Sequence, residues 1–146
     1  MAARLVEIIA RWLDNEPACR ALAIAGSWAR GDATPDSDLD LLILTPTKER
    51  WKDNADWLPK TGLGAAGHRV ISSARVQYGV VFSWHVLLHP DARVEFTFAD
   101  LSWAKGFPVD PGTRRVVSDG IEIMIDKDGL LALLLRQVRQ QAACIT

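Results

Sequence analysis

The stretch that decides the fold is GSWARGDATPDSDLD at residues 26–40, which follows a short apolar run, ALAIA, at residues 21–25. An apolar run of this length without polar alternation indicates a fully buried strand. Residues 27–30 fit one or two helical turns, and the polar residues 32–37, which include a proline, fit a turn. The apolar residues of DLDLLIL at 38–44 predict a second strand. The stretch therefore predicts two strands joined by a short helix and a turn.

The start of the predicted short helix has the features of a phosphate site. Its first backbone N–H groups point outward, and the positive end of the helix dipole lies behind them. Gly26 has no Cβ and lets a phosphate approach the backbone, while the Ser27 hydroxyl adds a donor. Arg30 is expected either to contact a polyphosphate or to form a surface ion pair. Ser37 is a further nucleotide-binding candidate or a turn former. Taken alone, Gly26-Ser27 also fits an ordinary turn with a serine N-cap.

Two acids lie close together at the start of the second predicted strand. Asp38 and Asp40 are two residues apart, so strand alternation places both side chains on one face, while Leu39 and Leu41 point to the core. Two carboxylates about 4 Å apart repel by about 4 kcal/mol at an effective dielectric of about 20. A hard cation removes this cost, and Mg²⁺ prefers carboxylates together with phosphate oxygens. An Asx-turn or an exposed strand start is the alternative explanation.

A third acid is expected from a neighbouring strand. RVEFTF at residues 93–98 places its valine and both phenylalanines on one face and Glu95 on the other. A lone acid inside a strand fits the third carboxylate of a site that holds two metal ions and orients an attacking hydroxyl. Glu95 is also a candidate base for the proton of that hydroxyl. Asp100, just past the strand, is the rival third acid, and an exposed edge-strand position is the structural alternative for Glu95.

The spacing of these residues resembles a known signature. GS at 26–27, ten intervening residues and DxD at 38–40 resemble the signature of the DNA polymerase β-like nucleotidyltransferase superfamily. The continuations ARG at 29–31 and SDLDLLI at 37–43 strengthen the resemblance. Within the superfamily the chain is similar to the minimal nucleotidyltransferases and the aminoglycoside adenylyltransferases. Residues 57–100 are a weaker match to the streptomycin 6-adenylyltransferase-like group.

This resemblance implies a fold and a reaction. The fold is α/β (α+β), with a mixed β-sheet flanked by helices as in the polymerase β palm. The reaction moves a nucleoside monophosphate, here AMP from ATP in preference to another NTP, to an acceptor hydroxyl and releases pyrophosphate. On this pattern Gly26 and Ser27 bind the triphosphate. Asp38, Asp40 and Glu95 are the catalytic acids and hold the metal, with two Mg²⁺ ions expected.

Length, composition and charge limit the classes of protein to which the chain can belong. The chain has 146 residues, 49% hydrophobic and 24% charged, which predicts one globular domain. The resemblance implies that residues 1–146 form a single nucleotidyltransferase domain. Its 17 Lys+Arg and 18 Asp+Glu give a net charge of −1, so we expect no general nucleic-acid or membrane-surface binder. The two cysteines, Cys19 and Cys144, form no metal motif. No signal peptide or membrane span is evident, and we expect a cytoplasmic protein.

The rest of the chain predicts a mixture of helices and strands. Apolar spacing predicts helices at 4–13, 46–58 and 129–141, and strands at 69–76, 80–88 and 93–98. Asp126 or Asp128 is expected to cap the last helix. The apolar residues on either side of the Asp-Gly pair at 119–120 predict a hairpin over 116–125.

One departure from the resemblance concerns the acceptor. Antibiotic-modifying members carry a second, helical domain that holds the acceptor, and the stretch after the loop at 108–111 is too short for one. We therefore expect a small molecule or a protein hydroxyl held by a second copy, in a homodimer, or by a separate protein. The chain also resembles antitoxins that modify or bind a HEPN ribonuclease toxin. A degenerate nucleotide-binding domain is a third alternative, and a nucleic-acid polymerase is the least supported.

Overall fold

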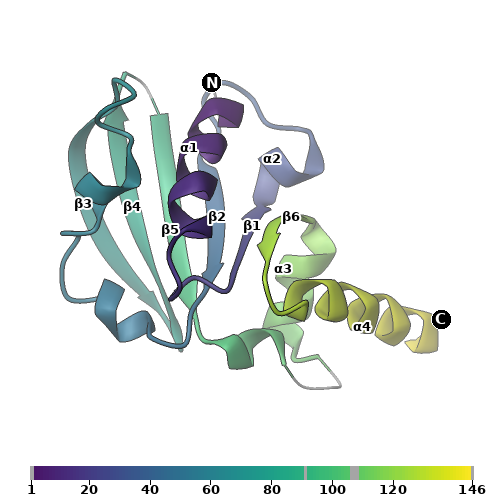
Figure 1. Ribbon diagram of the computed structural model, residues 1–146. Coiled ribbons are helices and arrows are strands. Elements are labelled where there is room, and N and C mark those ends of the chain that lie inside the picture. The colour runs from purple at the N-terminus through teal and green to yellow at the C-terminus, as the bar shows by residue number, and fades with distance from the viewer. Residues whose placement is uncertain (1, 91, 106–108, 146) are drawn as a thin grey trace.

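The structure, a computed structural model, describes residues 2–90, 92–105 and 109–145. Within these residues, six strands form one mixed sheet in the order β3-β4-β5-β2-β1-β6 (Figure 1). The strands are β1 (Ala21–Ala25), β2 (Leu39–Leu44), β3 (Arg69–Tyr78), β4 (Val81–His89), β5 (Ala92–Ala99) and β6 (Ile121–Asp126). β2 and β5 run parallel, and the other paired strands run antiparallel. The expected mixed sheet is confirmed.

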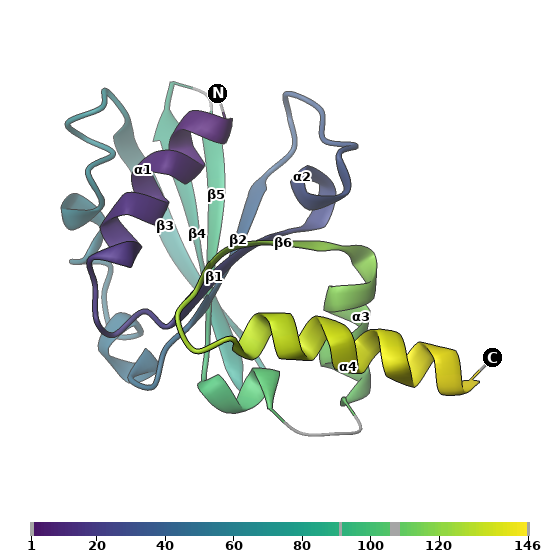
Figure 2. The ribbon, with the colours of Figure 1, turned by 45° about the vertical axis from the view of Figure 1, so that its right-hand side comes forward.

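Helices flank this sheet on both sides. The α-helices are α1 (Ala2–Asp14), α2 (Gly26–Arg30), α3 (Pro111–Asp119) and α4 (Leu130–Ile145). Short 3₁₀ turns are η1 (Lys48–Trp51), η2 (Leu58–Thr61) and η3 (Leu101–Ala104). Figure 2 shows α1 on one side of the sheet and α3 and α4 on the other. The fold is therefore three-layered at its centre.

The larger core lies between α1 and the sheet. α1 buries Ile9 and Leu13 against the inward residues of β2, β4 and β5. Trp51 and Trp57, from the segment between β2 and β3, join the same core, and the Trp57 ring stacks on Trp12 with centroids 5.9 Å apart. This aromatic burial fixes which face of β2 and β5 points inward, so the polar residues of both strands face the other side.

A second core lies on that other face and covers half of the sheet. Val117 of α3 and Leu134 of α4 pack with Ala23 of β1 and Leu42 of β2, and β5 contributes Ala99 from its end. Beyond this cluster the face is open, and all ten residues of β3 are exposed. The outward residues of β3, of the second half of β4 and of the first half of β5 therefore form an accessible floor beside the covered half.

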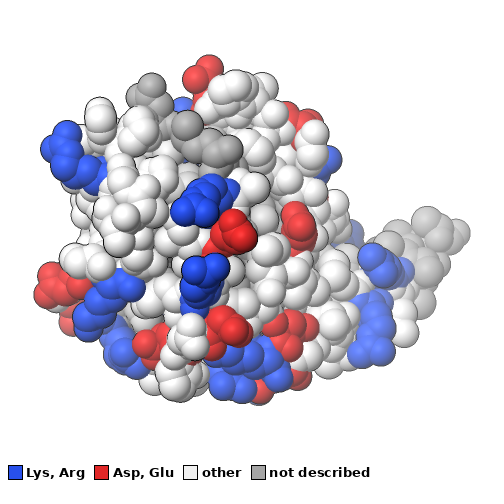
Figure 3. Space-filling model, turned by 45° about the horizontal axis from the view of Figure 1, so that its top comes forward, with Lys and Arg blue, Asp and Glu red and all other residues white. Residues whose placement is uncertain are grey.

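Charges are mixed at the end of the molecule where α2 lies. Figure 3, in which this end is turned forward, shows acidic and basic side chains interspersed. Nucleic-acid binders typically gather Lys and Arg on one face. The visible face has no one-sided basic surface of that kind.

Most of the predicted elements are present within a few residues of their expected ends. The helix predicted at 129–141 is α4, and the carboxylate of Asp126 accepts hydrogen bonds from the N–H groups of Leu131 and Ala132 at 3.0 and 2.9 Å. Asp126 is therefore the capping acid. Asp128 instead pairs with Arg20, with 2.7 Å between Oδ1 and a guanidinium nitrogen.

The helix predicted at 46–58 is wrong. In its place the chain makes η1, a loop and the start of η2. The Asn54 side chain accepts a hydrogen bond from the N–H of Asp56 at 3.0 Å, which satisfies the backbone in a turn rather than a helix. The loop also lets Trp51 and Trp57 both reach the larger core.

The hairpin predicted over 116–125 is also wrong in its first half. Its second strand is β6, but residues 116 and 117 belong to helix α3. Asp110 caps this helix by accepting from the N–H groups of Gly112 and Thr113, and Pro111 occupies the first turn. The Asp-Gly pair ends a helix here, with Gly120 at a φ of 114°. The Asp-Pro start signal outweighs the hairpin signal.

We predict that Asp110→Ala destabilises the protein by about 1 kcal/mol at neutral pH, because it removes an N-cap. Hydrogen bonds from Thr113 lower the pKa of Asp110, so its contribution is present at neutral pH and is lost as the pH falls below about 4. Urea unfolding at pH 7 and pH 3 measures both effects. Asp110→Asn, which keeps the acceptor oxygen, is the control. An equal penalty for both variants at pH 7 would contradict the capping role.

Candidate active site

Two of the predicted acids face one another across neighbouring strands. In the parallel β2–β5 pair, Asp40 is the direct partner of Glu95, and on its other side Asp40 pairs with Ala25 of β1. The flanking residues Leu39 and Leu41 are buried in the larger core, as alternation requires. The strand register therefore brings together two acids that are far apart in the sequence.

Burial and neighbouring charge change the ionisation of this pair. The pKa of Asp40 is raised to about 7: burial has the largest effect, the charge of Glu95, a hydrogen bond with Glu95 and the charge of Asp38 add to it, and the charge of Arg30 opposes it. A half-buried carboxyl group beside other acids favours its protonated form. Asp40 therefore keeps its proton up to about neutral pH.

Gly26 is required by the position of Asp40. The glycine has a φ of +68°, and a Cβ built on it would lie 2.5 Å from Oδ2 of Asp40. No L side chain fits there without displacing the carboxyl group. The turn from β1 into α2 therefore passes directly over Asp40. The N-cap position of α2 is Ala25, without a side-chain hydrogen bond, so the serine N-cap alternative for Ser27 is wrong.

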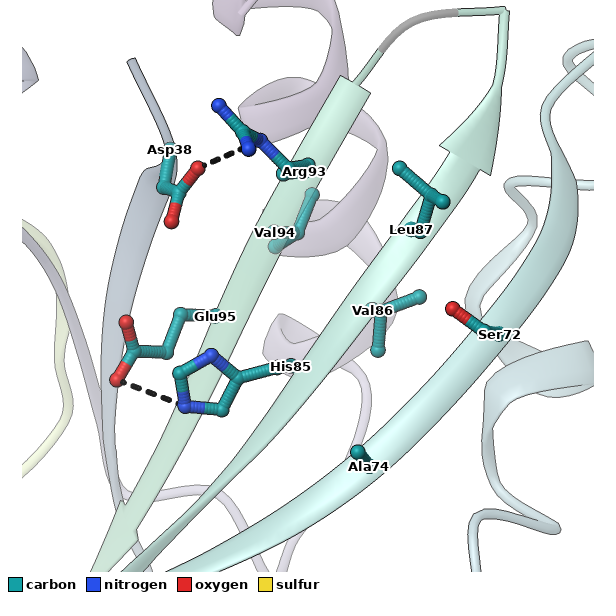
Figure 4. A pocket seen from close by; sticks show the side chains of 9 residues that line it. All are labelled: Asp38, Ser72, Ala74, His85, Val86, Leu87, Arg93, Val94 and Glu95. Atoms are coloured by element: carbon teal, nitrogen blue, oxygen red, sulfur yellow. Dashed lines mark ion pairs between the residues drawn. The ribbon is translucent and has the colours of Figure 1, made fainter.

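Asp38 lies on the same face, but its carboxylate turns to a different partner. Nε of Arg93 lies 2.9 Å from Oδ1 of Asp38 (Figure 4). The same guanidinium donates to the carbonyl of Asp36 at 2.7 Å. Across the described residues, no group of three or more His, Cys, Asp or Glu side chains is gathered closely enough to hold a metal ion. The structure thus pairs Asp40 with Glu95 and keeps Asp38 with Arg93.

A groove runs from these acids across the open half of the sheet. Its cavity volume is about 230 Å³. The lining residues are Asp38, Ser72, Ala74, His85, Val86, Leu87, Arg93, Val94 and Glu95. Figure 4 shows His85 pointing to Glu95, with 3.5 Å between Nε2 and Oε1. The Tyr78 hydroxyl lies 3.3 Å from the same imidazole nitrogen. The groove therefore ends at a wall made by Glu95 and His85.

The remaining predicted site residues lie in less direct positions. Arg30 pairs with Asp32, with 3.2 Å between Nε and Oδ2. The Ser37 hydroxyl accepts a hydrogen bond from the N–H of Thr34 at 2.9 Å, which shapes the turn. Asp100 follows the far end of β5 and pairs with Lys48, with 3.0 Å between Nζ and Oδ2. Asp100 is therefore not the partner of Asp40.

Arg93 and His85 were not predicted from the sequence as site residues. Arg93 stands two residues before Glu95 on β5, so the alternation that identified Glu95 also places Arg93 on the same face. His85 is different, because it comes beside Glu95 through the β4–β5 register. That register depends on the turn between two strands and has no local sequence signal.

The acids at this site fit a divalent cation by their chemistry. Asp40 and Glu95 offer hard carboxylate oxygens, which Mg²⁺ prefers, and the raised pKa of Asp40 marks a place where a positive charge is favoured. Gly26 keeps the space over Asp40 free of a side chain. Asp38 offers a third carboxylate two residues away on the same strand face.

Comparison with known proteins agrees with this geometry. The family model described as a nucleotidyltransferase domain matches residues 5–102. The chain belongs to the nucleotidyltransferase domain family. The match contains the turn at Gly26, Asp38, Asp40 and Glu95, and it ends in η3. No curated protein matches the nucleotidyltransferase chain.

Two solved structures are similar to this nucleotidyltransferase domain. An aminoglycoside 6-adenyltransferase from Bacillus subtilis has 16% identity and a TM-score of 0.50, with 66% of this chain and 34% of that chain covered. A cytoplasmic RNA terminal U-transferase has 20% identity and a TM-score of 0.41, with 66% and 27% covered. The first likeness supports the polymerase β-like fold. The chain spans about a third of the length of that adenyltransferase.

The helices of the nucleotidyltransferase also bear on the membrane expectation. Among the residues that the structure describes, no helix is both long enough and apolar enough to cross a membrane.

We predict that Gly26→Ala destabilises the protein more than Gly31→Ala does. Both glycines have positive φ, which costs a side chain about 1–2 kcal/mol. A Cβ at Gly31 meets nothing within 4 Å, whereas one at Gly26 meets Asp40. Thermal unfolding measures the difference. In an Asp40→Ala background, Gly26→Ala is expected to destabilise the protein no more than Gly31→Ala does. If Gly26→Ala still causes the larger destabilisation there, the contact with Asp40 is not its cause.

A second prediction concerns pH. The pKa of Asp40 is raised from 3.8 to about 7, so its protonated form is favoured in the folded state. Its contribution to stability is therefore full at acid pH and is lost as the pH rises through about 7. Without divalent cations, the wild type should lose more stability between pH 5 and pH 8 than Asp40→Asn does. Chemical unfolding between pH 5 and pH 8 measures the free energy of unfolding of both proteins. If the two free energies change with pH in parallel, the pKa of Asp40 is not raised.

Proposed function

We propose that this chain, acting over residues 1–146 as a single nucleotidyltransferase domain in the cytoplasm, transfers AMP from ATP to an acceptor hydroxyl and releases pyrophosphate. The observation that carries the proposal is the half-buried Asp40–Glu95 pair directly beneath the β1–α2 turn. Two carboxyl groups side by side favour a positive charge between them, and a turn without a side chain leaves room for a phosphate beside them.

The nucleotide side is proposed at α2. Gly26 and Ser27 bind the triphosphate through backbone N–H groups and the serine hydroxyl. Arg30 lies one turn further on, close enough for its charge to act on Asp40, and it contributes positive charge on this side. Ser37 contributes by holding the turn that leads into β2.

The metal is proposed at the three acids. Asp38, Asp40 and Glu95 would hold Mg²⁺, in two ions. When bound, Mg²⁺ supplies Lewis-acid stabilisation of the charge that develops on the phosphate oxygens. The pKa of Asp40 implies that its proton leaves as the cation binds, so affinity should increase with pH.

The acceptor side is proposed at the groove. In the sheet order, Gly26 and Ser27 follow β1 on one side of β2, while the groove lies over β5, β4 and β3 on the other. An acceptor in the groove and a nucleotide at α2 would thus meet at the acids. The acceptor oxygen forms a bond to the α-phosphorus, the bond from that phosphorus to the bridging oxygen breaks, and pyrophosphate leaves. Glu95 accepts the hydroxyl proton.

The source of the acceptor is proposed from the open sheet. The groove has its floor on β3 and β4, and the described helices leave that face uncovered. A second copy or a separate protein, such as a HEPN ribonuclease toxin, would complete the wall or carry the acceptor hydroxyl itself.

The test is nucleotide binding and transfer by wild type and Asp40→Asn. At a ligand concentration of 100 times Kd the native state gains about 2.7 kcal/mol, which raises Tm by about 5–10 °C for a domain of this size. We expect this rise with ATP and Mg²⁺ for wild type and its loss in Asp40→Asn. Radiolabel transfer from α-labelled ATP to the protein or to an added partner measures the reaction.

Asp36→Asn is the matched control. Asp36 precedes the same strand and is exposed, and the structure uses its backbone carbonyl rather than its carboxylate. It should behave as wild type. A Tm rise of equal size in Asp40→Asn, or no rise with any of the four NTPs, would overturn the proposal. If another NTP raises Tm more than ATP does, that NTP rather than ATP is the donor.

A further inference from the structure

One acid of the site, Asp38, forms an ion pair with a basic residue of the neighbouring strand, Arg93. Arg93 reaches from β5 to the strand that carries the aspartates and holds Asp38 through Nε at 2.9 Å. Its second contact, to the carbonyl of Asp36 at 2.7 Å, fixes the guanidinium to the loop before β2. Figure 4 shows the Asp38 carboxylate turned to Arg93, while Glu95 turns to His85.

This arrangement separates carboxylates that the backbone brings together. Asp38 and Asp40 share one face of the chain entering β2, and Asp40 is the direct partner of Glu95. Side-chain direction alone therefore permits all three acids to converge. The guanidinium fork matches a carboxylate and a carbonyl at once, which favours the turned-away position of Asp38.

We propose that Arg93 is a positioning residue that holds the Asp38 carboxylate away from Asp40 and Glu95. A divalent cation that binds all three acids must then displace the guanidinium from Asp38. Arg93 competes with the metal for one ligand and thereby sets how tightly the site binds it. This inference rests on the proposed metal site.

The exposure of the ion pair sets the size of the effect. The side chains of Arg93 and Asp38 are 58% and 43% exposed. Exposed ion pairs are weak, so the competition should change cation affinity by up to about five-fold and should not abolish binding. A displaced guanidinium remains at the rim of the groove, because Arg93 also lines it.

The experiment is a titration of the full chain with Mn²⁺ alone, in which isothermal titration calorimetry measures the affinity. Arg93→Gln is expected to bind Mn²⁺ about five-fold more tightly than wild type, and Arg93→Lys to lie between the two, because lysine keeps the charge but loses the fork. Arg75→Gln is the matched control. Arg75 lies on β3, and its guanidinium contacts Gln77 rather than a carboxylate. It should bind as wild type.

A double-mutant cycle separates competition from a general charge effect. If Arg93 acts through Asp38, the gain from Arg93→Gln should vanish in an Asp38→Asn background. A gain that persists there, or an affinity in Arg93→Gln equal to or weaker than wild type, would overturn the inference. Circular dichroism melting checks that each variant is folded, and Arg93→Lys provides a second, milder variant.

The design also distinguishes this inference from the proposed function. If wild type binds Mn²⁺, Asp40→Asn does not, and Arg93→Gln gains nothing, the metal site stands and the role of Arg93 is wrong. If no variant binds Mn²⁺, both fail. If Arg93→Gln binds measurably where wild type does not, the competition is stronger than inferred and the role of Arg93 is supported.

Discussion

The constraint on which the site depends is the parallel pairing of β2 with β5. This pairing sets Asp40 directly against Glu95 at the boundary between a covered and an open part of the sheet. Burial and the neighbouring acids then make Asp40 costly to ionise, and the turn above it must be glycine. The aromatic core on the opposite face holds both strands in this register, because Phe96 and Phe98 of β5 pack there with the tryptophans.

The two faces of the sheet have different roles, because one forms the larger core and the other carries the acids. One face is closed by α1 and the aromatic segment and provides most of the buried area. The other is closed by α3 and α4 over β1 and β2 but left open over β5, β4 and β3. The acids lie where these two halves meet. In the proposed arrangement, the nucleotide and the acceptor would reach the acids from different sides of β2.

Much of the site could be predicted because its signals are local. The strand alternation around Asp38 and Asp40 and the glycine before a short helix both follow from neighbouring residues. Glu95 was predicted by the same alternation. Arg93 carries the same alternation signal but was not singled out from the sequence. His85 could not be found locally, since its place depends on strand register.

The errors in the fold have the same origin. Residues 46–58 have helical apolar spacing, but Trp51 and Trp57 reach the core from a looped segment instead. Residues 116–117 follow a strong helix start at Asp110 and Pro111, which apolar pattern alone does not reveal.

The parallel β2–β5 pair has a further consequence for folding. Its partners are separated by the whole of β3 and β4, and such non-local pairing forms slowly. The Asp40–Glu95 pair depends on this non-local contact, so a growing chain acquires its acid pair only after β5 has docked beside β2.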